Sequence, residues 1–209
     1  MIIKYVNLIL EKIMQGDSMD NISIIIRNRN ESEHIGFAIQ SCIDHFSKPE
    51  IIIVDNNSTD ESLHIVNLFK DRTNIKVITI NDYTPGRSIN LGAKHATNDS
   101  ILVLSAHAQI TAIDLEMLNQ SFRAGYIAVC GNQTPIYKGK KITKRYIWSH
   151  FTTDIVDNLY SDIEDRYFLH NAFCFYNREF LLANPMPEQY PGKEDRFWAK
   201  DMVDKGHKY

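Results

Sequence analysis

A run of apolar residues that ends in a carboxylate constrains the fold of this chain more than any other feature. Positions 51 to 54 are isoleucine or valine, and Asp55 and a series of short polar residues follow. A strand of this kind is buried on both faces, as in a parallel sheet covered by helices. Ligands bind outside the carboxyl ends of such strands, so Asp55 is a candidate binding residue. Alternatively, Asp55 and Asp60 only shape a turn, and Ser58 with Glu61 forms a capping box.

Strand and helix patterns alternate through the first part of the chain. Apolar spacing predicts strands at 22–26, 51–54, 75–80, 101–104 and 126–130. It predicts helices at 35–46, 63–69, 86–96 and 111–124, the last capped by Thr111 and closed by Gly125. This alternation indicates an α/β domain with a mainly parallel sheet flanked by helices.

The pattern changes after Gly131. A strand is expected at 166–176, then a short helix through 183 capped by Asn177, and a last helix at 193–205 that stops at Gly206. Three prolines stiffen the loop before that last helix. We therefore divide the chain into an N-terminal helical extension and linker (1–21), a ligand-binding half (22–130) and a half that could hold a second substrate (131–209).

Composition excludes several classes of protein. The net charge of -3 gives no overall bias toward nucleic acid. Three scattered cysteines without a CxxC motif fit a reducing compartment rather than a disulfide framework. No apolar run reaches the ~20 residues of a membrane span. Residues 2–14 could form an amphipathic helix that docks on the domain, on a partner or on a membrane surface.

Five segments, in order along the chain, resemble the family 2 glycosyltransferases, which have the GT-A fold. They are Ser23–Glu31, Ile51–Asp60, Gly86–Gly92, Ile101–His107 and Lys193–Ala199. The last two resemble the strand that ends in the DxD metal motif and the "EDxxWA" helix. The resemblance covers residues 22 to 209, and the chain stops where the family normally continues.

This resemblance implies transfer of a sugar from a nucleotide-sugar donor with inversion at the anomeric carbon. The family's donor-binding positions correspond here to Arg27, Asn28, Glu31, Asp55, Asn57, Gly86 and Arg87. A carboxylate accepts hydrogen bonds from a base N–H or from ribose hydroxyls. Glycine permits close approach of a ligand, and arginine offers charge to a phosphate.

One motif departs from the family pattern. Ser105-Ala106-His107 stands where the family has Asp-x-Asp, and some rhamnosyltransferase-like members resemble this variant. His107 could bind a divalent cation such as Mn²⁺ or Mg²⁺, could hydrogen-bond the diphosphate directly, or could have a structural role.

The resemblance assigns the general base to Asp195 and acceptor contacts to Glu194 and Trp198. At a helix start, the amide dipoles would hold Asp195 ionised. Alternatively, both acids are ordinary N-terminal helix residues, and Trp198 packs the last helix against the sheet.

The sequence also bears on alternative functions and on the partners and location of the protein. A nucleotide-sugar-binding protein without catalysis is the alternative to the enzyme. A nucleotidyltransferase or a dinucleotide-binding oxidoreductase would need glycines after the first strand, and none occurs before Gly36. The expected partners are a nucleotide-sugar and a glycan or lipid-linked acceptor, as in polysaccharide and cell-envelope synthesis. The expected location is the cytoplasm, or peripherally the inner face of the membrane, where a basic run at 138–145 could contact anionic lipid.

Overall fold

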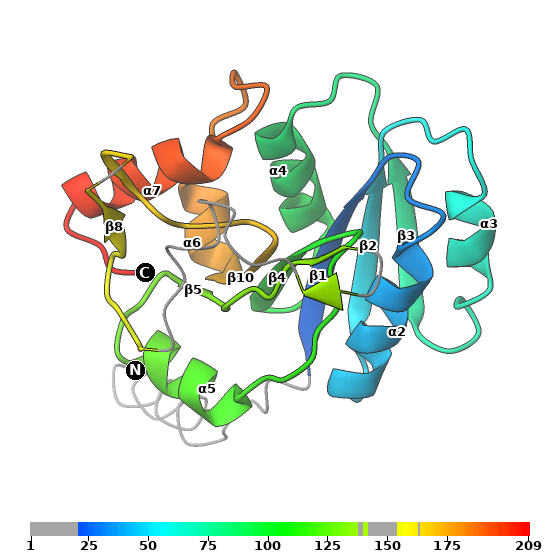
Figure 1. Cartoon of the computed structure of the whole chain (residues 1–209), viewed down its shortest axis with the longest axis horizontal. Coiled ribbons are helices and arrows are strands. Elements are labelled where there is room, and N and C mark those ends of the chain that lie inside the picture. Colours follow the sequence, from blue (N-terminus) through cyan, green and yellow to red (C-terminus); the bar gives the residue numbers. More distant parts are fainter. Residues whose placement is uncertain (1–20, 138–139, 142–153, 163) are drawn as a thin grey trace, which may run out of the picture.

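The computed structural model describes residues 21–137, 140–141, 154–162 and 164–209. Its centre is a six-stranded sheet with the strand order β3-β2-β1-β4-β10-β5 (Figure 1). The strands of this sheet are β1 (Ile22–Asn28), β2 (Glu50–Asp55), β3 (Asn74–Thr79), β4 (Ser100–Ser105), β5 (Ala128–Cys130) and β10 (Phe173–Asn177). Two small strand pairs stand apart: β6 (Ile136–Tyr137) with β7 (Lys140–Lys141), and β8 (Tyr160–Ser161) with β9 (Arg166–Tyr167). The helices are α2 (Ile35–His45), α3 (Ser62–Asn67), α4 (Pro85–His95), α5 (Leu115–Arg123), α6 (Arg178–Ala183) and α7 (Glu194–Asp204).

The first four strands run parallel, and their register brings their polar ends together. Asn28 at the end of β1 lies beside Asp55 at the end of β2, and Arg27 lies beside Ser105 at the end of β4. The later strand β10 is antiparallel to both β4 and β5. The predicted α/β domain with a mainly parallel sheet is confirmed.

Apolar residues cover both faces of the sheet, because successive side chains of a strand point to opposite sides. On one face Ile25 and Val103 pack with residues of α4, α6 and α7. On the other face Ile24 and Leu104 pack with residues of α2, α3 and α5. This two-sided burial explains why β1, β2 and β4 are continuous apolar runs, and it leaves polar side chains only at the strand ends.

Most predicted elements are confirmed, and three predictions of local structure are wrong. The fourth expected helix begins at Leu115 rather than near Thr111, because the Asp114 side chain accepts the cap hydrogen bond from Met117 N. The strand expected at 166–176 is two strands, β9 and β10, separated by residues 168–172. The capping box is absent, since α3 begins at Ser62 without a side-chain cap on its N-cap residue.

Several expectations concern residues outside the described part of the chain. These are the amphipathic helix at 2–14, most of the linker, and most of the basic run at 138–145. Within the described residues, no helix has the length and apolar character needed to cross a membrane. All three cysteines are free thiols, as expected.

Candidate active site

A pocket of about 230 Å³ lies at the carboxyl ends of β1 and β4. Its lining residues come from the ends of β1 and β4 and from the loops that follow β1, β2, β3 and β4: Arg27, Asn28, Arg29, Glu31, Asn56, Tyr83, Ser105, Ala106 and His107. A larger pocket of about 560 Å³ lies by α5 and β5, but none of the predicted site residues lines it. We assign the site to the smaller pocket, because polar groups converge there at the end of a parallel sheet.

Asp55 supports the floor of this pocket instead of lining it. Its side chain is buried, and Oδ1 accepts hydrogen bonds from Asn28 Nδ2 at 2.8 Å and from Ser58 Oγ at 2.6 Å. Its Oδ2 accepts from the backbone N–H of Ser58 at 3.0 Å. The turn role considered for Asp55 therefore fits its contacts, and the predicted donor contact of Asp55 stays a prediction.

Asn57 also lies outside the pocket lining. Its backbone is left-handed, with φ of 51°, and its Nδ2 donates to Ile80 O at 3.1 Å. The side chain thereby ties the loop after β2 to the end of β3. The neighbouring Asn56 lines the pocket, and the donor contact of Asn57 stays a prediction.

The loop after β1 is tied to the loop after β2 by side chains that accept from backbone amides. Ser58 Oγ accepts from Asn30 N at 3.0 Å, and Asp60 Oδ2 accepts from Ser32 N at 2.9 Å. Ser62 Oγ accepts from Glu31 N at 2.8 Å. Asp60 is thus a turn residue that joins two loops, and the polar series after β2 builds the rim of the pocket.

Two predicted residues, His107 and Glu31, meet at the pocket. Nδ1 of His107 lies 3.2 Å from Oε1 of Glu31. The imidazole side chain is 62% exposed and the carboxylate side chain 25% exposed, so a ligand can reach both. In the described part of the chain, no three histidine, cysteine or acidic side chains gather closely enough to form a metal site by themselves.

Arg27 connects this pocket to the acidic pair at the start of α7. Its guanidinium Nη1 donates to Glu194 Oε1 at 3.2 Å, and Glu194 is buried. The same oxygen accepts from Asn171 Nδ2 at 3.1 Å. Because these contacts enclose Glu194, the structure gives it a bridging role between β1 and α7.

Asp195 lies beside Glu194 and is held by backbone amides. Its Oδ1 accepts from Arg196 N at 2.8 Å and its Oδ2 from Asn171 N at 3.4 Å. Burial raises the pKa of Asp195 above its usual value, although these amides and the charges of Arg27 and Arg196 act in the opposite direction. The expected effect of the helix start is present, but burial outweighs it.

Trp198 packs in the core, and an acceptor contact by this side chain is not supported. It is 2% exposed, and its ring meets Tyr176 edge to face at a centroid distance of 5.4 Å. Its Nε1 donates to Asn184 O at 2.7 Å. The packing role considered from the sequence fits this placement.

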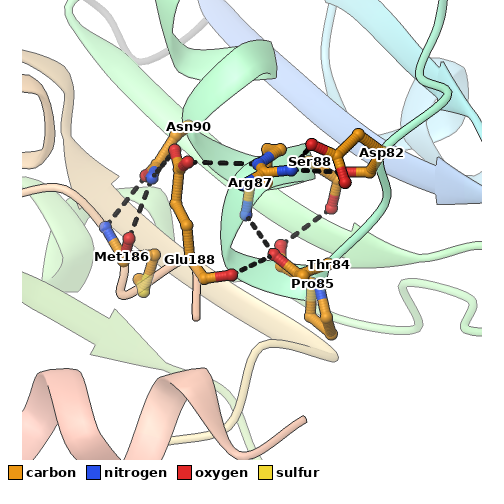
Figure 2. Close-up of polar contacts among 8 residues, drawn as sticks. All are labelled: Asp82, Thr84, Pro85, Arg87, Ser88, Asn90, Met186 and Glu188. Carbon is orange, nitrogen blue, oxygen red and sulfur yellow. Dashed lines mark hydrogen bonds and ion pairs between the residues drawn. The ribbon is translucent and has the colours of Figure 1, made fainter. Parts of the chain in front are cut away.

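Gly86 and Arg87 lie against the loop between α6 and α7, and neither lines the pocket. Figure 2 shows Arg87 facing Glu188 of that loop. A Cβ at Gly86 would lie 2.2 Å from Pro187 O, so the close approach is made by the protein backbone. The guanidinium of Arg87 pairs with Asp82 and with Glu188, whose Oε2 lies 3.2 Å from Arg87 Nε. These contacts show what Gly86 and Arg87 pack against in the structure, and their donor contacts stay predictions.

Sequence reasoning missed several residues of the site. Arg29 lies inside the Ser23–Glu31 segment that resembles the family, and Tyr83 lies three residues before the helix predicted at 86–96, so position gave a signal for both. Asn171 and Glu188 gave none, because their partners are distant in sequence. Beside Asn171, burial and the charges of Arg27 and Arg166 lower the pKa of His170 to about 4.

Comparison with known proteins agrees with this architecture. The family model described as glycosyl transferase family 2 matches residues 23–182. A search of curated proteins found no match. S. aureus TarS 1-349 in complex with UDP-GlcNAc is 22% identical, with a TM-score of 0.63 over 86% of this chain and 52% of that one. The mannosyltransferase PcManGT of Pyrobaculum calidifontis, in complex with GDP-Man and Mn²⁺, is 16% identical, with a TM-score of 0.63 over 89% and 52%.

The present chain spans about half the length of these structures, and their likeness to it concerns the fold. The fold is that of the GT-A glycosyltransferases, as the resemblance predicted. Since the family model covers well over half of the 209 residues, the chain belongs to glycosyl transferase family 2.

Proposed function

We propose that the chain is an inverting glycosyltransferase that moves a sugar from a nucleotide-sugar to a hydroxyl of a glycan or lipid-linked acceptor. One observation carries the proposal. Arg27 lines the pocket at the strand ends and also donates to Glu194, which directly precedes Asp195. A donor pocket and a candidate base are therefore joined through one side chain, as a transfer between two substrates requires.

The pocket has the chemistry to bind a nucleoside diphosphate. Arg27 and Arg29 supply positive charge for phosphate oxygens. Asn28 Oδ1 is buried without a hydrogen-bond partner, and Asn28 lines the pocket. An unsatisfied buried acceptor calls for an explanation, and a base N–H or a ribose hydroxyl would supply the missing donor. The nucleotide-sugars in the structures of TarS and PcManGT support the same class of donor.

Glu31 and His107 fit a divalent cation that is shared with the donor. Magnesium and manganese are often held by one or two side chains, with substrate phosphates and water completing the shell. The Glu31 and His107 pair provides two such ligands, 3.2 Å apart. A bound cation would neutralise the charge that develops on the leaving diphosphate.

Asp195 is proposed as the general base. The acceptor hydroxyl oxygen forms a bond to the anomeric carbon, the bond from that carbon to the diphosphate oxygen breaks, and the hydroxyl proton passes to Asp195. The raised pKa of Asp195 suits this role, because a base whose pKa lies nearer neutrality accepts a proton more readily. Glu194 remains ion-paired and positions Arg27.

Replacing the base tests the proposal. Asp195→Asn is expected to lower kcat about 10³-fold with donor affinity within about twofold of wild type. Asp201→Asn on the exposed side of α7 is the matched control and is expected to keep full turnover. Equal kcat for Asp195→Asn and the control would contradict the role of Asp195. Donor binding without turnover in wild type would favour the non-catalytic binding protein.

Thermal shift tests the cation site. Wild type and His107→Ala are compared with nucleoside diphosphates (UDP, GDP, dTDP), each with Mn²⁺ and with chelator, because a ligand stabilises the folded state to which it binds. Stabilisation that needs both Mn²⁺ and His107 supports the shared cation. Stabilisation that needs His107 but persists with chelator would instead show that His107 contacts the phosphate directly, without a shared cation.

A further inference from the structure

Glu188 lies in the loop that leads into the acidic pair. This loop, residues 184–193, joins α6 to α7 and contains three prolines, which restrict its backbone. It ends at Lys193, immediately before Glu194 and Asp195. Any displacement of the loop is therefore passed directly to the first turn of α7.

The first turns of α4 hold this loop through a set of contacts that we name the α4 clamp: Thr84, Arg87 and Asn90 on one side, Met186 and Glu188 on the other (Figure 2). Thr84 Oγ1 donates to Glu188 O at 2.9 Å. Arg87 Nε donates to Glu188 Oε2 at 3.2 Å, and Asn90 Nδ2 donates to Glu188 Oε1 at 2.9 Å. Both carboxylate oxygens of Glu188 are thus engaged by α4.

Asn90 completes the clamp with a two-way contact to the loop backbone. Its Nδ2 donates to Met186 O at 2.8 Å, and its Oδ1 accepts from Met186 N at 2.9 Å. Asn90 is 4% exposed and Met186 is 1% exposed, so water does not compete for these bonds. The buried half of the clamp is structural, whereas Glu188 forms its solvent-facing half, with a side chain that is 41% exposed.

The segment that carries the clamp also contributes to the donor pocket. Tyr83 lines that pocket and directly precedes Thr84, the N-cap of α4. The clamp therefore relates two parts of the site: Tyr83 on its α4 side and Asp195 on its loop side. Arg27 and Glu194 provide the second such connection.

We propose that Glu188 is a positioning residue, which through Arg87 and Asn90 fixes loop 184–193 on α4 and so sets the place of Asp195 relative to the donor pocket. The proposal rests on the proposed glycosyltransferase function. Misplacement of a reacting group by about 1 Å can cost about 10²-fold in rate. The hydrogen-bond partners of Glu188 in the described part of the chain, Thr84, Arg87 and Asn90, do not line the pocket. We therefore expect its loss to act on kcat and to leave donor binding intact.

Kinetics of Glu188→Ala and Glu188→Gln test this role against Glu179→Ala, an exposed glutamate of neighbouring α6. Glu188→Ala is expected to lower kcat about tenfold, with donor KM within about twofold of the control. Glu188→Gln keeps one acceptor oxygen, so we expect its kcat to lie between those of Glu188→Ala and wild type. A kcat equal to that of Glu179→Ala, or a parallel fall in donor affinity and melting temperature, would overturn the proposal.

Hydrogen exchange tests the positioning independently of turnover. Amides of residues 186–196 are expected to exchange at least about fivefold faster in Glu188→Ala than in Glu179→Ala, because the loop loses its attachment. Equal exchange rates would refute the positioning role even if no donor were known. If wild type binds a donor without turnover while the exchange rates differ, the proposed function fails and the attachment of the loop stands.

Discussion

The two sides of the candidate site are built in different ways. On the donor side, the loops after β1 and β2 are joined by short polar side chains that accept from backbone amides 28 residues earlier in the chain, as Ser58 and Asp60 do. On the catalytic side, the acidic pair is held by contacts between segments far apart in sequence. Glu188 meets α4 and Glu194 meets β1, at separations of about a hundred residues or more.

This difference indicates which polar residues are available to a ligand. In the loop after β2, Asp55 and Asn57 make hydrogen bonds to nearby loop residues, and Asn56 between them lines the pocket. On the catalytic side, the position of Asp195 depends on a few long-range bonds. We therefore expect substitutions in the donor loops to act first on stability, and substitutions on the catalytic side to act first on rate.

The largest loss of stability is expected from Asp55→Ala. This change removes the acceptor for Asn28 Nδ2, for Ser58 Oγ and for Ser58 N, and leaves buried donors unsatisfied. We expect a loss of about 3 kcal/mol in the free energy of unfolding, measured by urea denaturation. Asp71→Ala, at an exposed position, should change it by less than about 0.5 kcal/mol. Equal effects of the two changes would show that the turn does not depend on Asp55.

A pH dependence is expected from His170, on the catalytic side. Burial lowers its pKa from 6.5 to about 4 in the folded state. Because the folded pKa lies below the unfolded one, the unfolded state binds the proton first as the pH falls, and stability is lost between about pH 6.5 and pH 4. This group should contribute a loss of about 2 kcal/mol between pH 7 and pH 5.

Urea denaturation of wild type and His170→Gln at both pH values measures this contribution. The variant lacks the titrating group, so its stability should fall less over the same range. Parallel pH curves for the two proteins would contradict the assignment to His170.

A glycine comparison tests how closely the loop approaches α4. Gly86→Ala places a methyl group against Pro187 O, where the gap is 2.2 Å, whereas a Cβ at Gly192 meets nothing within 4 Å. The first change should cost about 2 kcal/mol and the second less than about 0.5 kcal/mol. Thermal unfolding measures the stability of the two variants, and equal melting temperatures would argue against close packing of Gly86 on the loop.

The smallest expected effect is a difference in nucleotide affinity between variants of Arg27 and Arg87, both of which the family resemblance places at the donor. Arg27→Gln should weaken binding of a nucleoside diphosphate about tenfold, or about 1.4 kcal/mol, because Arg27 lines the pocket. Arg87→Gln should change that affinity by less than about twofold, since its guanidinium faces Asp82 and Glu188. Titration calorimetry gives both values. A larger loss for Arg87→Gln would return Arg87 to the donor site.

The sequence predicted the fold well because the signals of the fold are local. Apolar runs identify β1, β2 and β4, and Asn177 and Gly206 mark helix ends as expected. The pocket was predicted in part: Arg27, Asn28, Glu31 and His107 line it, and all come from strand ends. What remained hidden depends on tertiary contacts. No sequence pattern indicates that Glu188 meets Arg87 or that Asn171 holds both acids.

The most direct test of the account is the structure of the chain with the nucleoside diphosphate that binds most tightly, in the presence of Mn²⁺. We predict that the nucleotide lies at the ends of β1 and β4, with its phosphates near Arg27 and His107. The side of the phosphates that faces Asp195 should then be open for the donor sugar and for the acceptor hydroxyl that attacks its anomeric carbon. A nucleotide bound in the larger pocket beside α5, or against Arg87 with the loop displaced, would contradict it.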